Sequence, residues 1–203
     1  MSDSALKSLS AIGFLTVIEH QEHGLFGGYL VLNRGGRPLE FHCTAPVKPN
    51  RAQEILYGPT LADYLYGEQI GPALVENAKI RPEIICTDVE PLLATQAGKQ
   101  SQLVLIYDPD KQDEPSSQED SQRQWHRRDA GSRDAGSHSW PQPPHTQLAE
   151  FTVAGHRLVV PQSRTASVGQ LTSALVGFAD TIELSEPFQR IRDAIEEAQQ
   201  MGS

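Results

Sequence analysis

The sequence predicts an α/β or α+β protein with a mixed β-sheet, helices on its faces and a long disordered insert. Three observations predict this class. Short β-rich apolar runs near the N-terminus are separated by turn-forming residues, as in an antiparallel meander. Further along, a strand, a short helix and a strand follow one another, which indicates a parallel crossover. Between positions 108 and 147 the chain contains no Val, Ile, Leu, Met or Phe.

The N-terminal meander is expected from three runs, at positions 14–19, 29–33 and 39–44. The second and third runs flank Asn33-Arg-Gly-Gly-Arg-Pro38, which is dense in turn formers. The first and second runs are joined by residues 20–28, where three glycines occur. We therefore expect two successive hairpins.

Helical signals follow the meander. Asn50 and Gln53 have the spacing of a capping box, and Gly58 with Pro59 would end that helix. The segment from Thr60 to Ala78 has apolar residues at helical spacing, but it also contains glycines and a proline. These residues predict that it is kinked or split into two helices.

The predicted crossover comes next. Residues 83–87 and 103–107 are compact apolar runs, and the second reads as a buried strand. Between them, Asp88 is placed to cap a short helix that includes Leu92 and Leu93.

Beyond position 107 the composition changes to polar and charged residues. The pentapeptide Arg128-Asp-Ala-Gly-Ser132 is repeated at once as residues 133–137, and such a duplication is tolerated where nothing is packed. This composition buries too little apolar surface to offset the entropy of ordering. We therefore expect an N-terminal tail over 1–11, one folded domain over 12–107 and 148–201, and a disordered polar insert over 108–147.

The C-terminal part predicts a hairpin and a closing helix. Residues 148–153 and 156–160 flank Ala154-Gly155, and residues 167–178 fit either one helix or a helix followed by a strand. Ser185 would cap the last helix, with a proline in its first turn. Its apolar stripe consists of Phe188, Ile191, Ile195 and Ala198.

The overall composition limits the class of protein. The net charge of −9 disfavours nucleic acid as a partner, because nucleic-acid binders usually carry a basic face. Cys43 and Cys86 lie in apolar runs and suggest reduced, buried thiols, and with His42 they lack the four ligands of a structural zinc site. The N-terminus lacks the pattern of a signal peptide, and no apolar run is long enough to span a bilayer. A cytoplasmic location is expected.

Four carboxylates lie at the ends of predicted strands or on a predicted helix, and together they are candidate catalytic residues. Glu19 ends the first strand, Glu54 lies on the first helix, and Asp88 and Asp108 follow the fourth and fifth strands. The order of elements is similar to the ribonuclease H-like fold. That resemblance implies carboxylates that converge on two Mg²⁺ ions and align a water for phosphodiester hydrolysis. The alternative is that these carboxylates have only structural roles, at strand ends and as helix caps.

A second candidate site lies in the connection between the third strand and the first helix. Four side chains of this connection could bind an anion at the helix N-terminus: Arg37, His42, Lys48 and Arg51. The alternative is a rigid connection whose prolines fix the backbone angles.

Several segments also resemble a group of bacterial proteins of unknown function. They are Gly28–Asn33, Arg37–Thr44, Pro49–Gly58 and Ser185–Arg192. The resemblance implies the same domain boundaries and brings no activity with it.

No nucleotide-binding loop, nucleophile elbow or zinc-protease motif occurs in the sequence. The leading hypothesis is therefore a non-enzymatic binding or interaction module without a cofactor, which would contact a protein partner or a second copy and no membrane. The alternative is a ribonuclease H-like phosphodiesterase that uses Mg²⁺.

Overall fold

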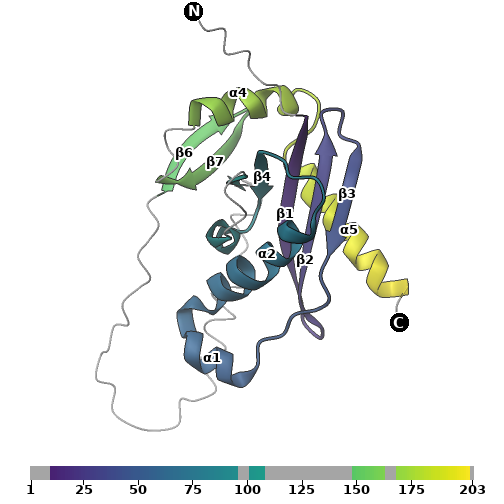
Figure 1. Cartoon of the computed structure of the whole chain (residues 1–203), viewed down its shortest axis with the longest axis vertical. Coiled ribbons are helices and arrows are strands. Elements are labelled where there is room, and N and C mark those ends of the chain that lie inside the picture. Colours follow the sequence, from purple (N-terminus) through teal and green to yellow (C-terminus); the bar gives the residue numbers. More distant parts are fainter. Residues whose placement is uncertain (1–9, 96–100, 108–147, 163–167, 202–203) are drawn as a thin grey trace, which may run out of the picture.

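A seven-stranded mixed sheet forms the centre of the computed structural model, which describes residues 10–95, 101–107, 148–162 and 168–201 (Figure 1). The strand order is β3-β2-β1-β4-β5-β7-β6. The strands are β1 (Ala11–His20), β2 (Gly24–Asn33), β3 (Pro38–Cys43), β4 (Ile84–Thr87), β5 (Gln102–Tyr107), β6 (Leu148–Val153) and β7 (His156–Pro161). The predicted insert over 108–147 and most of the predicted tail lie outside the described residues.

The predicted meander and hairpins are present in this sheet. β1 pairs with β2 antiparallel over its whole length, and β2 pairs with β3 antiparallel. β4 runs parallel to β1, and β5 runs parallel to β4. β7 is antiparallel to both β5 and β6, so the C-terminal hairpin extends the sheet. The prediction of a mixed sheet with an N-terminal meander is confirmed.

The helical elements are α1 (Arg51–Tyr57), the 3₁₀ turn η1 (Gly58–Thr60), the π-helix η2 (Asp63–Ile70), α2 (Gly71–Asn77), the 3₁₀ turn η3 (Glu90–Ala94), α4 (Val168–Ala179) and α5 (Glu186–Met201). The predicted capping box of α1 forms between Asn50 and Gln53, and Gly58 ends the helix with a φ of +47°. Within 60–78, the π-helix η2 passes directly into α2 at Gly71 with helical backbone angles on both sides, so the segment changes its hydrogen-bonding pattern there and is not broken.

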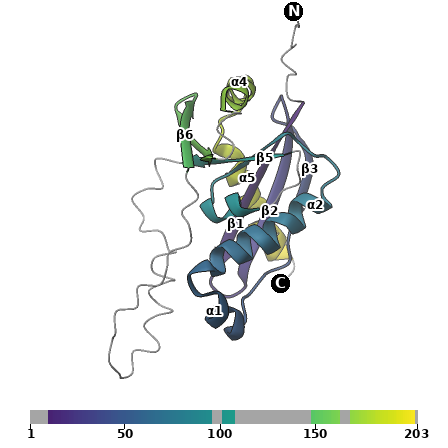
Figure 2. The same ribbon diagram turned by 60° about the vertical axis from the view of Figure 1, so that its left-hand side comes forward.

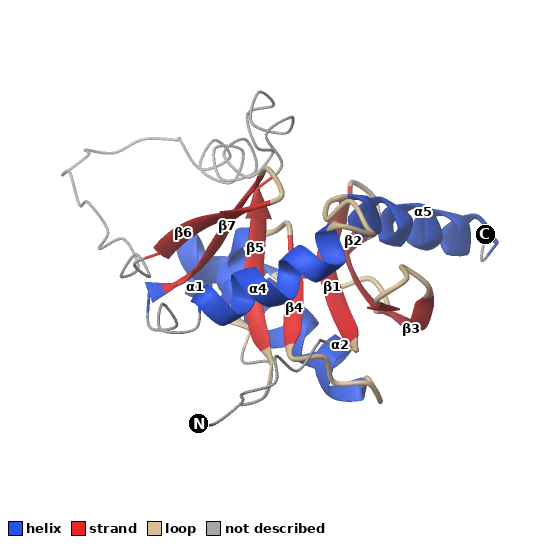
Figure 3. Cartoon of the chain, turned by 90° about the horizontal axis from the view of Figure 1, so that it is seen from above, coloured by secondary structure: helices blue, strands red, loops and turns tan. Residues whose placement is uncertain are grey.

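Two local expectations need correction, for Asp88 and Ala198, and the alternatives left open over residues 168–178 are decided. Val89, and not Asp88, stands at the start of η3, because the Asp88 carboxylate bonds to residues far away in the sequence. Residues 168–179 form one helix, α4, without a strand. Ala198 is exposed, because the last turns of α5 extend past the sheet (Figure 3).

Helices cover both faces of the sheet, and alternate residues of β1 serve the two cores. Ile12 and Phe14 lie in the core beneath α4 and α5. Leu15 and Val17 lie in the core beneath η2, α2 and η3. Figure 2 shows α2 and α5 on opposite sides of β1 and β2. This alternation decides which side chains of β1 can share a site.

Two adjacent glycines of β2 let helices approach the sheet closely on both faces. A Cβ atom at Gly27 would overlap the side chain of Ile70, and one at Gly28 would overlap that of Ile191. The second contact fixes the height of α5 above β1 and β2. Among the described helices, none is both long and apolar enough to cross a bilayer.

Candidate functional site

The chain topology singles out one end of the sheet. β1 is followed by β2 on one side, while its neighbour on the other side is β4, so the strand order reverses between β1 and β4. In open α/β sheets, ligands bind beyond the carboxyl ends of strands at such a switch point. The β1–β4 pairing ends at Leu15 and Thr87, so the next residues of the two strands border this place.

Asp88 is the first residue beyond β4, and its carboxylate is held from two directions. The Thr16 hydroxyl of β1 donates to Oδ1 at 2.6 Å, and Nη2 of Arg192 donates to Oδ2. The Thr87 hydroxyl accepts the backbone N–H of Val89 at 3.1 Å and closes the turn that presents Asp88. The Asp88 side chain is 6% exposed and that of Arg192 is 26% exposed. The site is therefore a half-covered ion pair oriented by a threonine.

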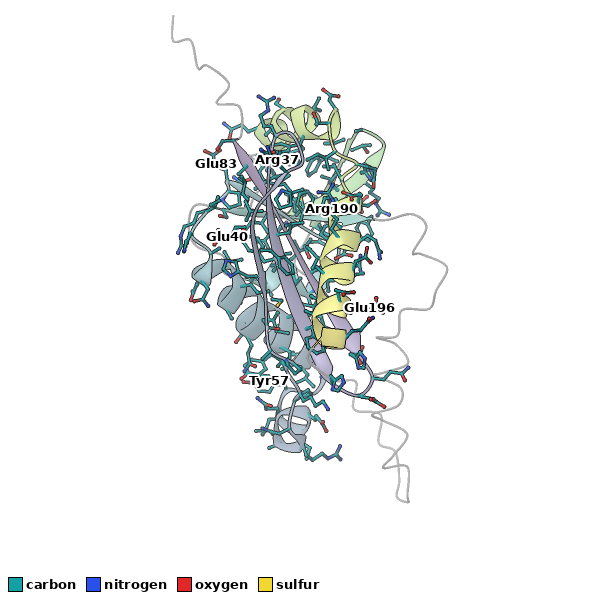
Figure 4. The ribbon with its side chains drawn as sticks, turned by 90° about the vertical axis from the view of Figure 1, so that its right-hand side faces the viewer. Arg37, Glu40, Tyr57, Glu83, Arg190 and Glu196 are labelled. Atoms are coloured by element: carbon teal, nitrogen blue, oxygen red, sulfur yellow. The ribbon has the colours of Figure 1, made fainter. Side chains whose placement is uncertain are left out.

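The apolar stripe of α5 brings Arg192 to this place. The Phe188 ring meets Phe14 of β1 edge to face, with the ring centroids 5.5 Å apart. Ile191 is fully buried above Gly28, which anchors the next turn of the helix. Because Arg192 follows Ile191 directly, its side chain leaves the edge of the stripe and reaches the end of β4. In Figure 4, α5 lies along this face of the sheet.

A pocket of about 280 Å³ opens beside the ion pair. Its lining residues are Asp88, Ile106, Glu183, Ser185, Glu186, Phe188, Gln189 and Arg192. Three of these described residues are acids and one is a cation, so the lining is acidic. Hydrophobic contact comes from Ile106 and Phe188 alone. The pocket thus combines one guanidinium with several carboxylates at the start of α5.

The other two acids of the pocket also have partners. Glu183 accepts hydrogen bonds from the hydroxyl of Ser185 at 2.7 Å and from its backbone N–H at 3.1 Å, and lies 3.2 Å from Nε2 of His156. Burial alone would raise the pKa of Glu183, but these neighbours lower it below its ordinary value. Glu186 pairs with Arg190 at 2.6 Å. Both carboxylates are therefore fixed by neighbours at the start of α5 or on β7.

Glu19 does not belong to this site. It has the same parity on β1 as Leu15 and Val17, so its side chain leaves the sheet on the face of η2 and α2. Its charge contributes to raising the pKa of Tyr66 on that face to about 12, although burial is the larger cause. Thr16 and Asp88 lie on the other face. Glu19 and Asp88 therefore cannot bind the same ion.

The remaining predicted carboxylates do not complete a cluster either. Glu54 pairs with Arg51 along α1 at 3.4 Å, and none of the residues of α1 is buried. Asp108 lies outside the described residues. Within the described part of the chain, no group of three or more His, Cys, Asp or Glu side chains is placed to hold a metal ion.

This donor set does not fit the two Mg²⁺ ions that the ribonuclease H-like resemblance implies. A two-metal site needs several carboxylates that share the ions. Here the β1 residue beside Asp88 is a threonine, and a guanidinium already contacts the carboxylate. The other two carboxylates of the pocket, those of Glu183 and Glu186, already have partners of their own.

The four candidate anion-binding residues do not form one site. His42 bonds to Glu40 at 2.7 Å, and Lys48 donates to the backbone oxygen of Glu22. Arg51 pairs with Glu54, and the backbone N–H of Arg37 bonds within the β2–β3 turn. Figure 4 shows Arg37 near one end of the molecule and Tyr57, at the end of α1, near the other. The segment between β3 and α1 is therefore a connection whose polar side chains bond to nearby groups.

Glu40 has a structural part in that connection. Its carboxylate accepts the backbone N–H groups of Lys79, at 2.9 Å, and Ile80, at 2.8 Å. These bonds, together with the His42 ring, lower the pKa of Glu40 from 4.5 to about 2. The ionised carboxylate thereby ties β3 to the loop that follows α2.

This linkage predicts a pH dependence of stability. Because the pKa of Glu40 is lower in the folded state, its contribution is complete above about pH 4.5 and is lost as the pH falls towards 2. Urea unfolding at pH 6 should show Glu40→Gln to be less stable than the wild type, and the difference should shrink at about pH 3. Glu196→Gln, at an exposed position of α5, is the matched control. A difference that is independent of pH would contradict this assignment.

The sequence reasoning missed Thr16 and Arg192. A polar residue in the middle of the apolar run Phe14–Ile18 was a usable signal for Thr16, since a buried hydroxyl needs a partner. For Arg192 the pattern offered no comparable signal, because its partner is 104 residues away.

Comparison with known proteins gives no family for this chain: no family model and no curated protein matches it. Among solved structures it matches two DNA complexes of endonuclease V from Ciona intestinalis, which contain an inosine followed by a ribo-adenosine. The first, of a variant enzyme, has a TM-score of 0.41 at 10% identity, over 97% of this chain and 89% of that one. The second has a TM-score of 0.40 at 11% identity, over 97% and 90%.

These matches correct two expectations from the sequence. Both matched structures are of a nuclease with bound DNA. The first expectation that they contradict is the leading hypothesis of a non-enzymatic binding or interaction module. The second is that the net charge disfavours nucleic acid as a partner. Both expectations are withdrawn. At these scores and identities the complexes transfer no residue role to this chain.

Proposed function

We propose that this chain is a phosphodiesterase that acts on nucleic acid, with its site in the pocket beside Asp88. The observation that carries the proposal is the position of this pocket at the switch point between β1 and β4. The first five strands have the arrangement β3-β2-β1-β4-β5, with β2 antiparallel to its neighbours and β4 and β5 parallel to β1. This arrangement supports the ribonuclease H-like resemblance expected from the order of the elements.

The ion pair offers the two groups that hydrolysis of a phosphodiester requires. The Asp88 carboxylate can accept a proton from a water that attacks phosphorus, while the bond from phosphorus to the leaving sugar oxygen breaks and that oxygen takes a proton from solvent. Arg192 can donate hydrogen bonds to the phosphate oxygens, since a guanidinium carries five N–H donors in a planar fork. Thr16 positions the carboxylate by its bond to Oδ1.

The size and charge of the pocket limit the substrate. A volume of about 280 Å³ is at the lower end of the range for small-molecule sites, so it admits about one nucleotide unit while the rest of a strand stays outside. The acidic lining repels a long polyanion, so tight binding is not expected. Turnover is therefore more informative than affinity.

The test is cleavage of end-labelled oligonucleotides by the full chain, followed on denaturing gels. Single-stranded and duplex DNA and RNA of the same sequence should be compared, each in EDTA and in Mg²⁺. We expect at least one of them to be cut. Asp88→Asn should lower the rate about a hundredfold or more, because it removes the proton acceptor.

Glu90→Gln is the matched control, since Glu90 is an exposed acid two residues further along. Its cleavage rate should equal that of the wild type. Failure to cut any of the four substrates, or equal rates for Asp88→Asn and Glu90→Gln, would refute the proposal.

A further inference from the structure

We infer that the chain forms a symmetric dimer through the outer edge of β3, where a second copy continues the sheet. The inference goes beyond the proposed activity and does not depend on it. It rests on three features of the described residues. The edge strand directs backbone groups outward, it leaves apolar side chains exposed on one face, and α5 extends past it on that same face.

The backbone of β3 is available for pairing on its outer side. β3 is the first strand of the sheet order, so among the described residues no strand pairs with its outer side. Thr44, directly after β3, donates its backbone N–H to the backbone oxygen of Gly27 in β2 at 3.0 Å. Successive residues of a strand direct these groups to opposite sides, and residues 40–43 pair regularly with β2. The N–H and C=O groups of Phe41 and Cys43 therefore point away from β2, as a partner strand requires.

The same strand exposes apolar side chains on one face of the sheet. Phe41 is 39% exposed and Leu39 is 47% exposed. Phe41 pairs with Leu30, which belongs to the core beneath α5, so the Phe41 side chain leaves the sheet on the α5 face. Cys43, two residues further along, is exposed as well. Charged side chains, which commonly protect an edge strand from pairing, do not occur among these three residues.

The helix α5 extends past this edge on the same face. It crosses the sheet from β1, where Phe188 packs, to β2, where a Cβ atom at Gly28 would come within 2.9 Å of Ile195. Gly28 pairs with Cys43, so the next turn of the helix passes the Cys43 end of β3. That turn carries Ala198, which continues the apolar stripe and is exposed (Figure 3). The helix thus lies over a place that one more strand of the sheet would occupy.

One register makes the edge of β3 complementary to itself. With a twofold axis at Phe41, the two Phe41 residues exchange both of their backbone hydrogen bonds in an antiparallel pair. Glu40 then lies opposite the partner subunit's His42, and Leu39 lies opposite the partner subunit's Cys43. An axis at Glu40 or at His42 would place like groups opposite one another instead. The pairing of acid with imidazole therefore selects the Phe41 register and a second copy as the occupant.

Sedimentation velocity of the full chain tests the dimer. We expect twice the mass of one chain at micromolar concentrations. Phe41→Lys brings two ammonium groups together at the axis and should raise the dissociation constant about tenfold or more. Because Phe41 is already partly exposed, the variant should keep the circular dichroism spectrum of the wild type. Leu56→Lys is the matched control, since Leu56 is 81% exposed on α1, and it should remain a dimer.

Disulfide trapping tests the register. Leu39→Cys places a thiol opposite the partner subunit's Cys43, at a Cα separation that a disulfide can span. Within one chain these two positions are four residues apart on a strand, about 13 Å, so a bridge between them must join two chains. Mild oxidation should give a covalent dimer on a non-reducing gel.

Two proteins serve as controls for this bridge. In the wild type, and in Leu39→Cys combined with Cys43→Ser, the thiols of the two chains would lie about 13 Å apart along the paired strands. Neither protein should form the covalent dimer. Cys86 is buried and does not compete for the bridge.

A wild-type chain with the mass of a monomer would overturn the inference. Slow reaction of Cys43 with a thiol reagent in such a monomer would show that another segment of the same chain covers the edge. Equal dissociation constants for Phe41→Lys and Leu56→Lys, or no covalent dimer from Leu39→Cys, would also overturn it. None of these measurements uses cleavage, so the dimer and the proposed phosphodiesterase activity can fail separately.

Discussion

Ile191→Asp is expected to lower the free energy of unfolding by about 4 kcal/mol or more, a large part of the stability of a typical domain. Ile191 is a fully buried residue of α5, and its side chain lies in the core that the helix shares with β1 and β2. Gly28 of β2 leaves it no room to move, because the backbone of the strand approaches that side chain closely. A carboxylate at this position would lose its hydration without gaining a partner.

The measurement is urea unfolding followed by circular dichroism. Ala194→Asp places the same charge on an exposed position of the same helix, and it should change stability by less than about 0.5 kcal/mol. Equal stabilities of the two variants would mean that α5 does not pack on the sheet. Since α5 also carries Arg192 and much of the pocket lining, such a result would remove the candidate site as well.

The elements predicted correctly are those with local signals. The meander was predictable because Asn33–Pro38 combines turn formers between two apolar runs, and the pairing of β2 with β3 follows from that turn. The capping box of α1 depends on two residues three positions apart. The closing helix has an apolar stripe at helical spacing, of which Phe188, Ile191 and Ile195 are buried. Each of these signals is carried by residues that are close together in the sequence.

The candidate site was predictable only in part, because it depends on register. Asp88 was identified from its position after a buried strand, but as a cap of the next helix. Its partner on β1 follows from the parallel pairing of Leu15 with Thr87, and short-range patterns do not encode that register. The choice of Glu19 followed from its acidity, while the alternation of side chains along β1 assigns it to the other face.

Arg192 illustrates why the rest could not be predicted. In the sequence it is one of several charged residues beside the apolar stripe of α5, where a solvent-exposed arginine is the ordinary expectation. Its contact with Asp88 requires both the packing of Phe188 on Phe14 and the turn after β4. The pairing is thus a product of tertiary structure.

Arg192→Met is expected to lower the free energy of unfolding by about 2–3 kcal/mol, because it removes the guanidinium that pairs with the covered Asp88 carboxylate. The loss is placed below the usual range for fully buried pairs because the Arg192 side chain is 26% exposed. Asp88→Asn should also destabilise, since it leaves the guanidinium without its partner.

The double variant separates pairing from simple packing. With both charges removed, the loss should be smaller than the sum of the two single losses by at least about 1 kcal/mol, as expected for groups in direct contact. Urea unfolding of the four proteins in EDTA gives this coupling energy. The parallel cycle with Arg190→Met and Asp88→Asn should be additive, because Arg190 pairs with Glu186 instead. Additivity in both cycles would show that the Asp88–Arg192 contact contributes nothing to the fold.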